Sequence, residues 1–194
     1  FREKNLFFIY HPETLEKNFG FKGLVNSLKI LSKLKNTMVI LSSSNADTNY
    51  IKFDNIIKKY CKKYEHLKLI PTIKHDVYLS SLKFMNAIVG NSSSGILEAP
   101  SLKIPTLNIG GRQDGRLRSE SIIDCGYETI EIKKKLYEIL ILKNKKNIYK
   151  NPYDYGDSVK KIINKIKKLS QKHHKDKKQF FDITNDYQVK KLFR

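Results

Sequence analysis

Cysteine is scarce in this sequence and long apolar runs are missing, and each shortage excludes a class of protein. Cys61 and Cys125 lie far apart, and neither belongs to a Cys-x-x-Cys or a histidine-rich pattern. The sequence therefore predicts neither a disulfide framework nor a zinc site, and we expect reduced thiols in a cytoplasmic protein. No apolar run approaches the roughly 18 residues that a membrane-spanning helix needs, so no membrane partner is expected.

The first residues, FREKN, lack the design of a secretory signal peptide. They also lack an initiator methionine and are followed almost at once by a strand-like run. We therefore expect the 194 residues to be a piece of a longer protein.

Acidic residues are few, 19 against 38 lysines and arginines, which gives a formal net charge of +19. Since 40% of the residues are hydrophobic, the chain should fold and carry this charge on its surface. The lysines are spread along the chain among many isoleucines and asparagines, a pattern that genomic composition bias also produces. Net charge favours non-specific association rather than a specific partner, so we expect no specific nucleic-acid ligand. An anionic ligand would still be attracted.

Short apolar segments alternate with amphipathic segments along most of the chain. The apolar runs are typical of strands buried on both faces of a parallel sheet. We expect strands at 6–10, 37–41, 67–70, 87–89 and 106–109, and helices at 21–34, 51–64, 77–85, 132–142 and 157–169. This alternation predicts an α/β fold, a Rossmann-like parallel sheet with helices on both faces. We expect one such domain over residues 1–169 and a basic appendage over residues 170–194.

The stretch VGNSSSGILEAP places three serines and a glycine between a predicted strand and a short helix. A phosphate group could bind here, because the segment offers hydroxyls, the free N–H groups of a first helical turn and a glycine that permits close approach. The alternative, equally favoured by the sequence, is that the serines form a turn and cap the helix. Glu98 follows Ser94 by one helical turn. A carboxylate would repel a diphosphate, so its function would be to accept hydrogen bonds from ribose hydroxyls; the alternative is compensation of the helix dipole.

Arginines and a histidine follow two other predicted strands. The segment GGRQDGRLRSES contains Arg112, Arg116 and Arg118, whose guanidinium groups suit phosphate oxygens, although a solvated basic loop is the alternative. His11 could donate to a phosphate or stay neutral and bind a backbone carbonyl. Ligands bind at the carboxyl ends of the strands in such sheets. The histidine, serine and arginine loops and the loop around Asn45 all fall there, and together they fit a nucleoside diphosphate.

Three motifs, in order, resemble one family. They are YHPET, then VGNSSSGILEAPSLKIPTLNIGGRQDGRLRSESIIDC, then NPYDYGDS. Over residues 7 to about 169 the chain is similar to the carboxyl-terminal domain of the hydrolysing UDP-N-acetylglucosamine 2-epimerases of sialic and legionaminic acid biosynthesis. The resemblance implies half of a GT-B fold, in which two Rossmann-like domains bind a UDP-sugar between them.

The resemblance also implies a function for each candidate residue. His11 would contact the diphosphate or the sugar and is the candidate catalytic residue. The implied UDP contacts are Asn45 near the nucleotide, Ile70 at the uracil, Ser92, Ser93, Ser94 and Gly95 at the diphosphate, Glu98 at the ribose, and Arg112 and Arg116 completing the site.

The implied reaction is anti elimination of UDP through a 2-acetamidoglucal-like intermediate, followed by addition of water with inversion at C2. The product would be N-acetylmannosamine or a 2,4-diacetamido analogue, and no cofactor or metal is implied. Most acids and bases would come from an amino-terminal domain that is absent here. We therefore expect this chain alone to bind UDP weakly and to catalyse nothing, and the full-length enzyme to be a homo-oligomer.

The segment 115–121, GRLRSES, departs from a Gly-Arg-x-x-Gly-Glu-Asn pattern that some members of the family carry. This departure leaves the choice of sugar open.

Two other interpretations of the function are consistent with parts of the sequence. The donor-nucleotide domain of a GT-B glycosyltransferase would share the sheet, the glycine-rich helix start and the ribose-binding glutamate, but the Gly-Arg-Gln loop argues against it. A basic RNA-binding module is the second alternative. The aromatic residues fall within apolar periods, and no RNP or KH motif is present, which argues against RNA.

Overall fold

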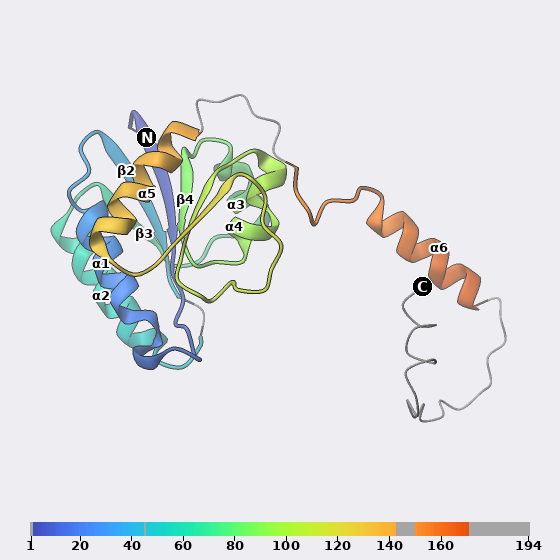
Figure 1. Ribbon diagram of the computed structural model, residues 1–194, viewed down its shortest axis with the longest axis horizontal. Helices are drawn as coiled ribbons and strands as arrows, with labels where there is room; N and C mark the ends of the chain where they lie inside the picture. Colours follow the sequence, from blue (N-terminus) through green and yellow to red (C-terminus); the bar gives the residue numbers. More distant parts are fainter. Residues whose placement is uncertain (1, 45, 143–149, 171–194) are drawn as a thin grey trace. The chain divides into compact units, whose positions relative to one another are not determined.

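A computed structural model of the chain describes residues 2–44, 46–142 and 150–170 (Figure 1). Six strands form one sheet in the order β3-β2-β1-β4-β5-β6. Every neighbouring pair in it is parallel. The strands are β1 Lys4–Ile9, β2 Thr37–Ser42, β3 Leu67–Ile70, β4 Ala87–Gly90, β5 Thr106–Ile109 and β6 Ile122–Cys125. The predicted Rossmann-like parallel sheet is therefore confirmed.

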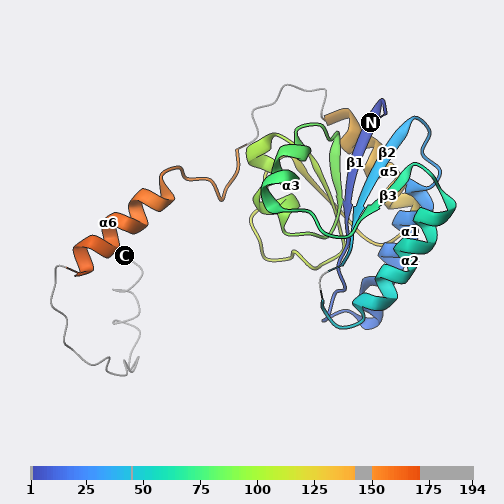
Figure 2. The ribbon, with the colours of Figure 1, turned by 180° about the vertical axis from the view of Figure 1, so that it is seen from behind.

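Helices cover both faces of the sheet (Figures 1 and 2). One face carries α1 Phe21–Leu31, preceded by the short η1 Lys17–Gly20, together with α2 Tyr50–Lys63 and α5 Thr129–Leu142. The other face carries α3 His75–Leu82, the one-turn α4 Ser94–Leu97 and η2 Ala99–Leu102.

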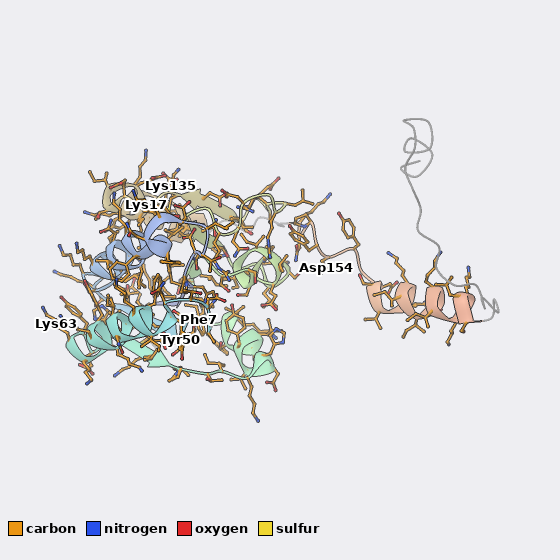
Figure 3. All side chains as sticks on the ribbon, turned by 90° about the horizontal axis from the view of Figure 1, so that it is seen from below. Phe7, Lys17, Tyr50, Lys63, Lys135 and Asp154 are labelled. Carbon is orange, nitrogen blue, oxygen red and sulfur yellow. The ribbon has the colours of Figure 1, made fainter. Side chains whose placement is uncertain are left out.

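The side chains of β1 alternate between these two cores, as a strand buried on both faces requires. Leu6 and Phe8 pack in the cluster that includes α1, α2 and α5, whereas Phe7 and Ile9 pack in the cluster with α3. Figure 3 shows Phe7 inside the molecule and Lys63 on its outside. The apolar runs of the sequence thus build the core, and lysines lie on the surface.

The strand order contains one reversal, and it lies between β1 and β4. The chain adds β2 and β3 on one side of β1 and then returns to place β4 on the other side. Ile9 at the end of β1 lies in register with Gly90 at the end of β4. The loops that leave these two strands therefore diverge at the topological switch point, the usual ligand site of an open α/β sheet.

All five predicted strands are found within two residues of their expected bounds, but β6 was missed. It has four residues, forms the edge of the sheet, and includes the exposed Asp124. Because Asp124 interrupts its short apolar run, the segment gives no clear strand pattern. Two helices also begin earlier than predicted, α3 at His75 and α5 at Thr129, because their first residues are polar or, like Ile130, exposed and so give no buried apolar period.

The chain divides into two units, Phe1–Asp154 and Tyr155–Arg194. The second contains α6, Ser158–Ser170, which confirms the helix expected at 157–169, and the carbonyl of Asp157 accepts the N–H of Lys161 at 2.9 Å. The domain boundary placed at residue 169 from the sequence stays a prediction, and residues 171–194 of the predicted appendage lie outside the described residues. Within the described part of the chain, no helix has the length and apolarity to cross a membrane.

Candidate functional site

Asn91, the first residue after β4, joins the ends of the two central strands. Its Oδ1 accepts the backbone N–H of His11 at 2.7 Å, and its Nδ2 donates to the carbonyl of His11 at 2.9 Å. His11 is 6% exposed and Asn91 is 0% exposed, so this one amide provides a partner for both buried backbone groups of His11. The position of His11 is thus fixed by a side chain 80 residues away.

Gly90 permits this close approach of β1 and β4. Its φ is +135°, a conformation that L side chains rarely adopt, and a Cβ atom there would lie 1.9 Å from the carbonyl oxygen of Ile9. Any other residue would therefore push the ends of the two strands apart.

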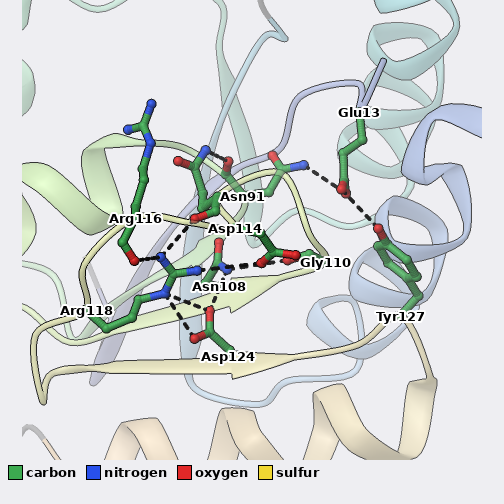
Figure 4. A network of polar contacts seen from close by, with 10 residues as sticks. Glu13, Asn91, Asn108, Gly110, Asp114, Arg116, Arg118, Asp124 and Tyr127 are labelled. Atoms are coloured by element: carbon green, nitrogen blue, oxygen red, sulfur yellow. Dashed lines mark hydrogen bonds and ion pairs between the residues drawn. The ribbon is translucent and has the colours of Figure 1, made fainter. Parts of the chain in front are cut away.

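A buried carboxylate connects the loops that follow β1, β4 and β6 (Figure 4). Glu13 is 3% exposed. Its Oε2 accepts the hydroxyl of Tyr127 at 3.0 Å, and its Oε1 accepts the Nδ2 of Asn91 and the hydroxyl of Tyr10, each at 3.3 Å. Burial raises the pKa of Glu13, and these donated hydrogen bonds oppose the rise. At Gly110 a Cβ would lie 2.6 Å from Oε1, so glycine is needed beside this carboxylate.

The serine loop, Ser92–Gly95, leads from the end of β4 into the first residues of α4 and presents hydrogen-bond donors that no described residue uses. The N–H groups of Ser92 and Ser93 and the hydroxyl of Ser93 donate to no group in the described residues. The hydroxyl of Ser92 accepts the N–H of Ser94 at 3.3 Å, and its own O–H has no acceptor among the described residues, whereas the hydroxyl of Ser94 is bonded to that of Tyr78. Ser92 and Ser93 therefore offer two backbone N–H groups and two hydroxyls to an anion.

Gly95 allows this loop to lie directly against the sheet. A Cβ at Gly95 would lie 2.6 Å from Cγ2 of Thr106 on β5, and the hydroxyl of Thr106 donates to the carbonyl of Gly95 at 2.9 Å. Gly95 thus fixes the serine loop above the sheet.

Glu98 lies just past the one-turn α4 and forms a pair with a histidine. Its N–H donates to the carbonyl of Ser94 at 2.9 Å. Its Oε1 lies 2.8 Å from Nε2 of His75, the first residue of α3. The Glu98 side chain is 32% exposed, so a ligand can reach it.

Arg112 lies beside the start of the serine loop. Its Nη1 donates to the carbonyl of Asn91 at 3.3 Å, and its Nη2 lies 3.8 Å from Oδ2 of Asp47. Burial and then the nearby Arg112 charge lower the pKa of His11 to about 4, so this imidazole is neutral at neutral pH. A guanidinium and a neutral imidazole therefore flank the junction of β1 and β4.

The other two arginines of the loop differ from Arg112. Arg118 donates to Asp124 at 3.0 Å and to the carbonyls of Gln113 and Arg116 at 2.9 Å, so it stabilises the loop itself (Figure 4). The side chain of Arg116 is exposed and extends away from this network in Figure 4. Among these three arginines, Arg112 alone contacts the residue next to the serine loop.

A hollow of about 500 Å³ opens next to Arg112, between the segment 12–16, Asp47 and the segment 111–114. Four carboxylates line it, which disfavours a diphosphate. The unused N–H groups of the serine loop, rather than this hollow, are the better anion donors.

The structure thus places most of the predicted site residues at one edge of the sheet. Ile70 ends β3 at the same edge, with β2 between it and β1. Asn45 lies outside the described residues. The residues that lie around the ends of β1, β4 and β5 are His11, Ser92, Ser93, Ser94, Gly95, Glu98 and Arg112.

Four residues around the site were not predicted from the sequence: Glu13, His75, Asn91 and Tyr127. Asn91 and Glu13 stand inside the motifs NSSSG and YHPET, which was the available signal. The bond between Asn91 and Glu13 spans 78 residues and that between Glu13 and Tyr127 spans 114, and no local spacing reveals such pairs.

Comparison with known proteins shows that residues 1–167 match the protein family described as UDP-N-acetylglucosamine 2-epimerase. The chain is 44% identical over 124 residues to the GDP/UDP-N,N'-diacetylbacillosamine 2-epimerase (hydrolyzing) of Campylobacter jejuni, covering 63% of this chain and 32% of that protein. It is 36% identical over 181 residues to the polysialic acid biosynthesis protein P7 of Escherichia coli, covering 90% of this chain and 45% of that protein. The chain therefore spans between a third and a half of these curated relatives.

Solved structures give the same fold. The S. aureus MnaA-UDP co-structure matches with a TM-score of 0.68 at 14% identity, covering 92% of this chain and 48% of that one. The Methanocaldococcus jannaschii UDP-GlcNAc 2-epimerase in complex with UDP-GlcNAc and UDP matches with a TM-score of 0.66 at 21% identity. This match covers 85% of this chain and 46% of that one. At these identities the likeness establishes the sheet and its helices.

Proposed function

Because the chain belongs to the UDP-N-acetylglucosamine 2-epimerase family, we propose that it is the UDP-binding half of a hydrolysing 2-epimerase. One observation supports this most strongly. The unused N–H groups of Ser92 and Ser93 lie next to Asn91, whose carbonyl accepts a hydrogen bond from the Arg112 guanidinium. Backbone donors and a guanidinium together suit a diphosphate, and they lie at the switch point of the sheet.

The remaining contacts of the proposed site follow from this placement of the diphosphate. Glu98 would accept hydrogen bonds from the ribose hydroxyls, since it lies one turn beyond the serine loop. The backbone at Ile70 would contact the uracil, and Asn45 and Arg116 would lie close to the nucleotide. Neutral His11 would donate to the diphosphate or the sugar without adding charge.

In the whole enzyme, we propose, UDP is eliminated from the sugar and water is then added with inversion at C2. The leaving diphosphate gains negative charge, and the serine-loop donors with Arg112 would stabilise it. The acids and bases that act on the sugar would come mainly from an amino-terminal half, so this chain alone would release no UDP. The product would be N-acetylmannosamine or a 2,4-diacetamido analogue, and the full-length enzyme would be a cytoplasmic homo-oligomer.

UDP should raise the melting temperature of the chain, because a ligand that binds only the native state stabilises it by mass action. At ten times its Kd, UDP adds about 1.4 kcal/mol, or roughly 3 to 6 °C for a domain of this size. Thermal unfolding in 150 mM salt with UDP, uridine or pyrophosphate is the measurement. Uridine lacks the diphosphate, and pyrophosphate controls for attraction to the net positive charge. If UDP raised the melting temperature no more than pyrophosphate does, the proposal would be wrong.

A further inference from the structure

The pair between His75 and Glu98 lies where two elements on the same face of the sheet meet. His75 begins α3, and Glu98 follows α4. One turn further along α3, the hydroxyl of Tyr78 bonds to that of Ser94 in the serine loop. The first turn of α3 therefore contacts the candidate nucleotide site at two points.

The pair contributes little to the stability of the fold. The His75 side chain is 69% exposed, and solvent-exposed ion pairs stabilise proteins by about 0 to 1 kcal/mol. Its main effect is to hold the side chain of Glu98 in one conformation. Glu98 lies beyond a helix of a single turn, and its only side-chain hydrogen bond to a described residue is the one to His75. Without that bond, the carboxylate could take several rotamers.

The bond leaves most of the acceptor capacity of the Glu98 carboxylate to a ligand. Oε1 accepts from Nε2 of His75, whereas Oε2 has no hydrogen bond within the described residues. A carboxylate oxygen can accept two hydrogen bonds, so Oε2 and the second lone pair of Oε1 can together accept from two neighbouring hydroxyls. Two vicinal hydroxyls are what the ribose of a nucleotide presents.

We propose that His75 is a specificity-determining residue, which fixes the Glu98 carboxylate for the two ribose hydroxyls and so favours ribonucleotides over 2′-deoxyribonucleotides. This inference depends on the proposed UDP site. Fixing the carboxylate before the ligand arrives reduces the ordering cost of binding. The diphosphate contacts of the serine loop and Arg112 do not depend on His75, so its effect should be confined to the sugar hydroxyls.

The test is calorimetric titration of the chain with UDP and with 2′-deoxy-UDP. The wild-type chain should prefer UDP by about tenfold, the value of one charge-assisted hydrogen bond. In His75→Ala this preference should fall to about twofold, with the affinity for 2′-deoxy-UDP changed by less than about twofold. His75→Gln, which keeps a donor at a similar reach, should restore most of the preference.

Lys74→Ala is the matched control, because it removes a full positive charge one residue away from the pair and should leave the preference unchanged. Thermal unfolding of each variant checks that the fold is intact. A His75→Ala chain that keeps the full preference would overturn the inference, as would a wild-type chain that binds both nucleotides equally. Failure of the wild-type chain to bind either nucleotide would instead overturn the proposed UDP site.

Discussion

Replacing Arg112 with alanine should weaken UDP binding by about 100-fold, which corresponds to the loss of two charge-assisted hydrogen bonds to phosphate oxygens. Arg112 is the arginine whose guanidinium contacts the carbonyl of Asn91, directly before the unused donors of the serine loop. Alanine would leave the backbone donors in place but remove the cation. The measurement is the Kd for UDP by isothermal titration calorimetry in 150 mM salt.

Arg2→Ala is the matched control, since it removes the same charge from the opposite end of β1. Arg2 bonds to Asn5 through its backbone, and its side chain has no hydrogen bond to any residue that the structure describes. We expect its Kd for UDP to change by less than about twofold. Equal weakening by the two substitutions would show that UDP responds to the net charge of +19 rather than to a site, and would contradict the assignment.

Replacing Asn91 with aspartate should lower the free energy of unfolding by about 3 to 5 kcal/mol, the range for an uncompensated buried charge. The Nδ2 group of Asn91 lies 2.9 Å from the carbonyl of His11 and 3.3 Å from the carboxylate of Glu13. A carboxylate oxygen in its place would repel both groups in a site with no solvent exposure. Urea unfolding at pH 7 measures the loss.

The deficit of Asn91→Asp should shrink as the pH falls. Burial beside Glu13 raises the pKa of the new carboxyl above its unfolded value, so its protonated form is the one that folding favours. Asn26→Asp is the control, because Asn26 also donates to a carbonyl, that of Tyr127 at 2.9 Å, but is only partly buried. We expect a loss of about 1 kcal/mol there. Equal losses at the two positions would show that Asn91 does not join β1 to β4 as described.

Much of the fold could be predicted because the strands of a doubly covered parallel sheet are apolar along their whole length. Leu6–Tyr10 reads as such a strand, and its residues do alternate between two cores. The edge strand β6 was not predictable in this way, because only one side of it is paired and Asp124 interrupts its apolar run. Edge strands need less burial, so their sequences give a weaker signal.

The site could be predicted where its residues follow strands directly, since the carboxyl ends of parallel strands meet at one edge. The positions of Ser92, Ser93 and Arg112 at this edge were predicted in this way, and their binding of UDP stays a prediction. The distinction between Arg112 and Arg118 could not be predicted, because it depends on the pairing of Arg118 with Asp124, a residue of the strand that was missed. The hydrogen-bond partners of Glu98 and His11 could not be predicted from the sequence either, because each partner belongs to a separate element of the fold.

The place where UDP binds can be measured residue by residue from ¹H–¹⁵N correlation spectra recorded during a titration with UDP. We predict the largest shift changes at the backbone amides of Ser92, Ser93 and Gly95 and at Nε of Arg112, with little change at Thr37 at the opposite end of the sheet. Changes confined to Thr37 and its neighbours, or to the lysine-rich α6, with the serine-loop amides unmoved, would contradict a nucleotide site at the carboxyl ends of β1 and β4.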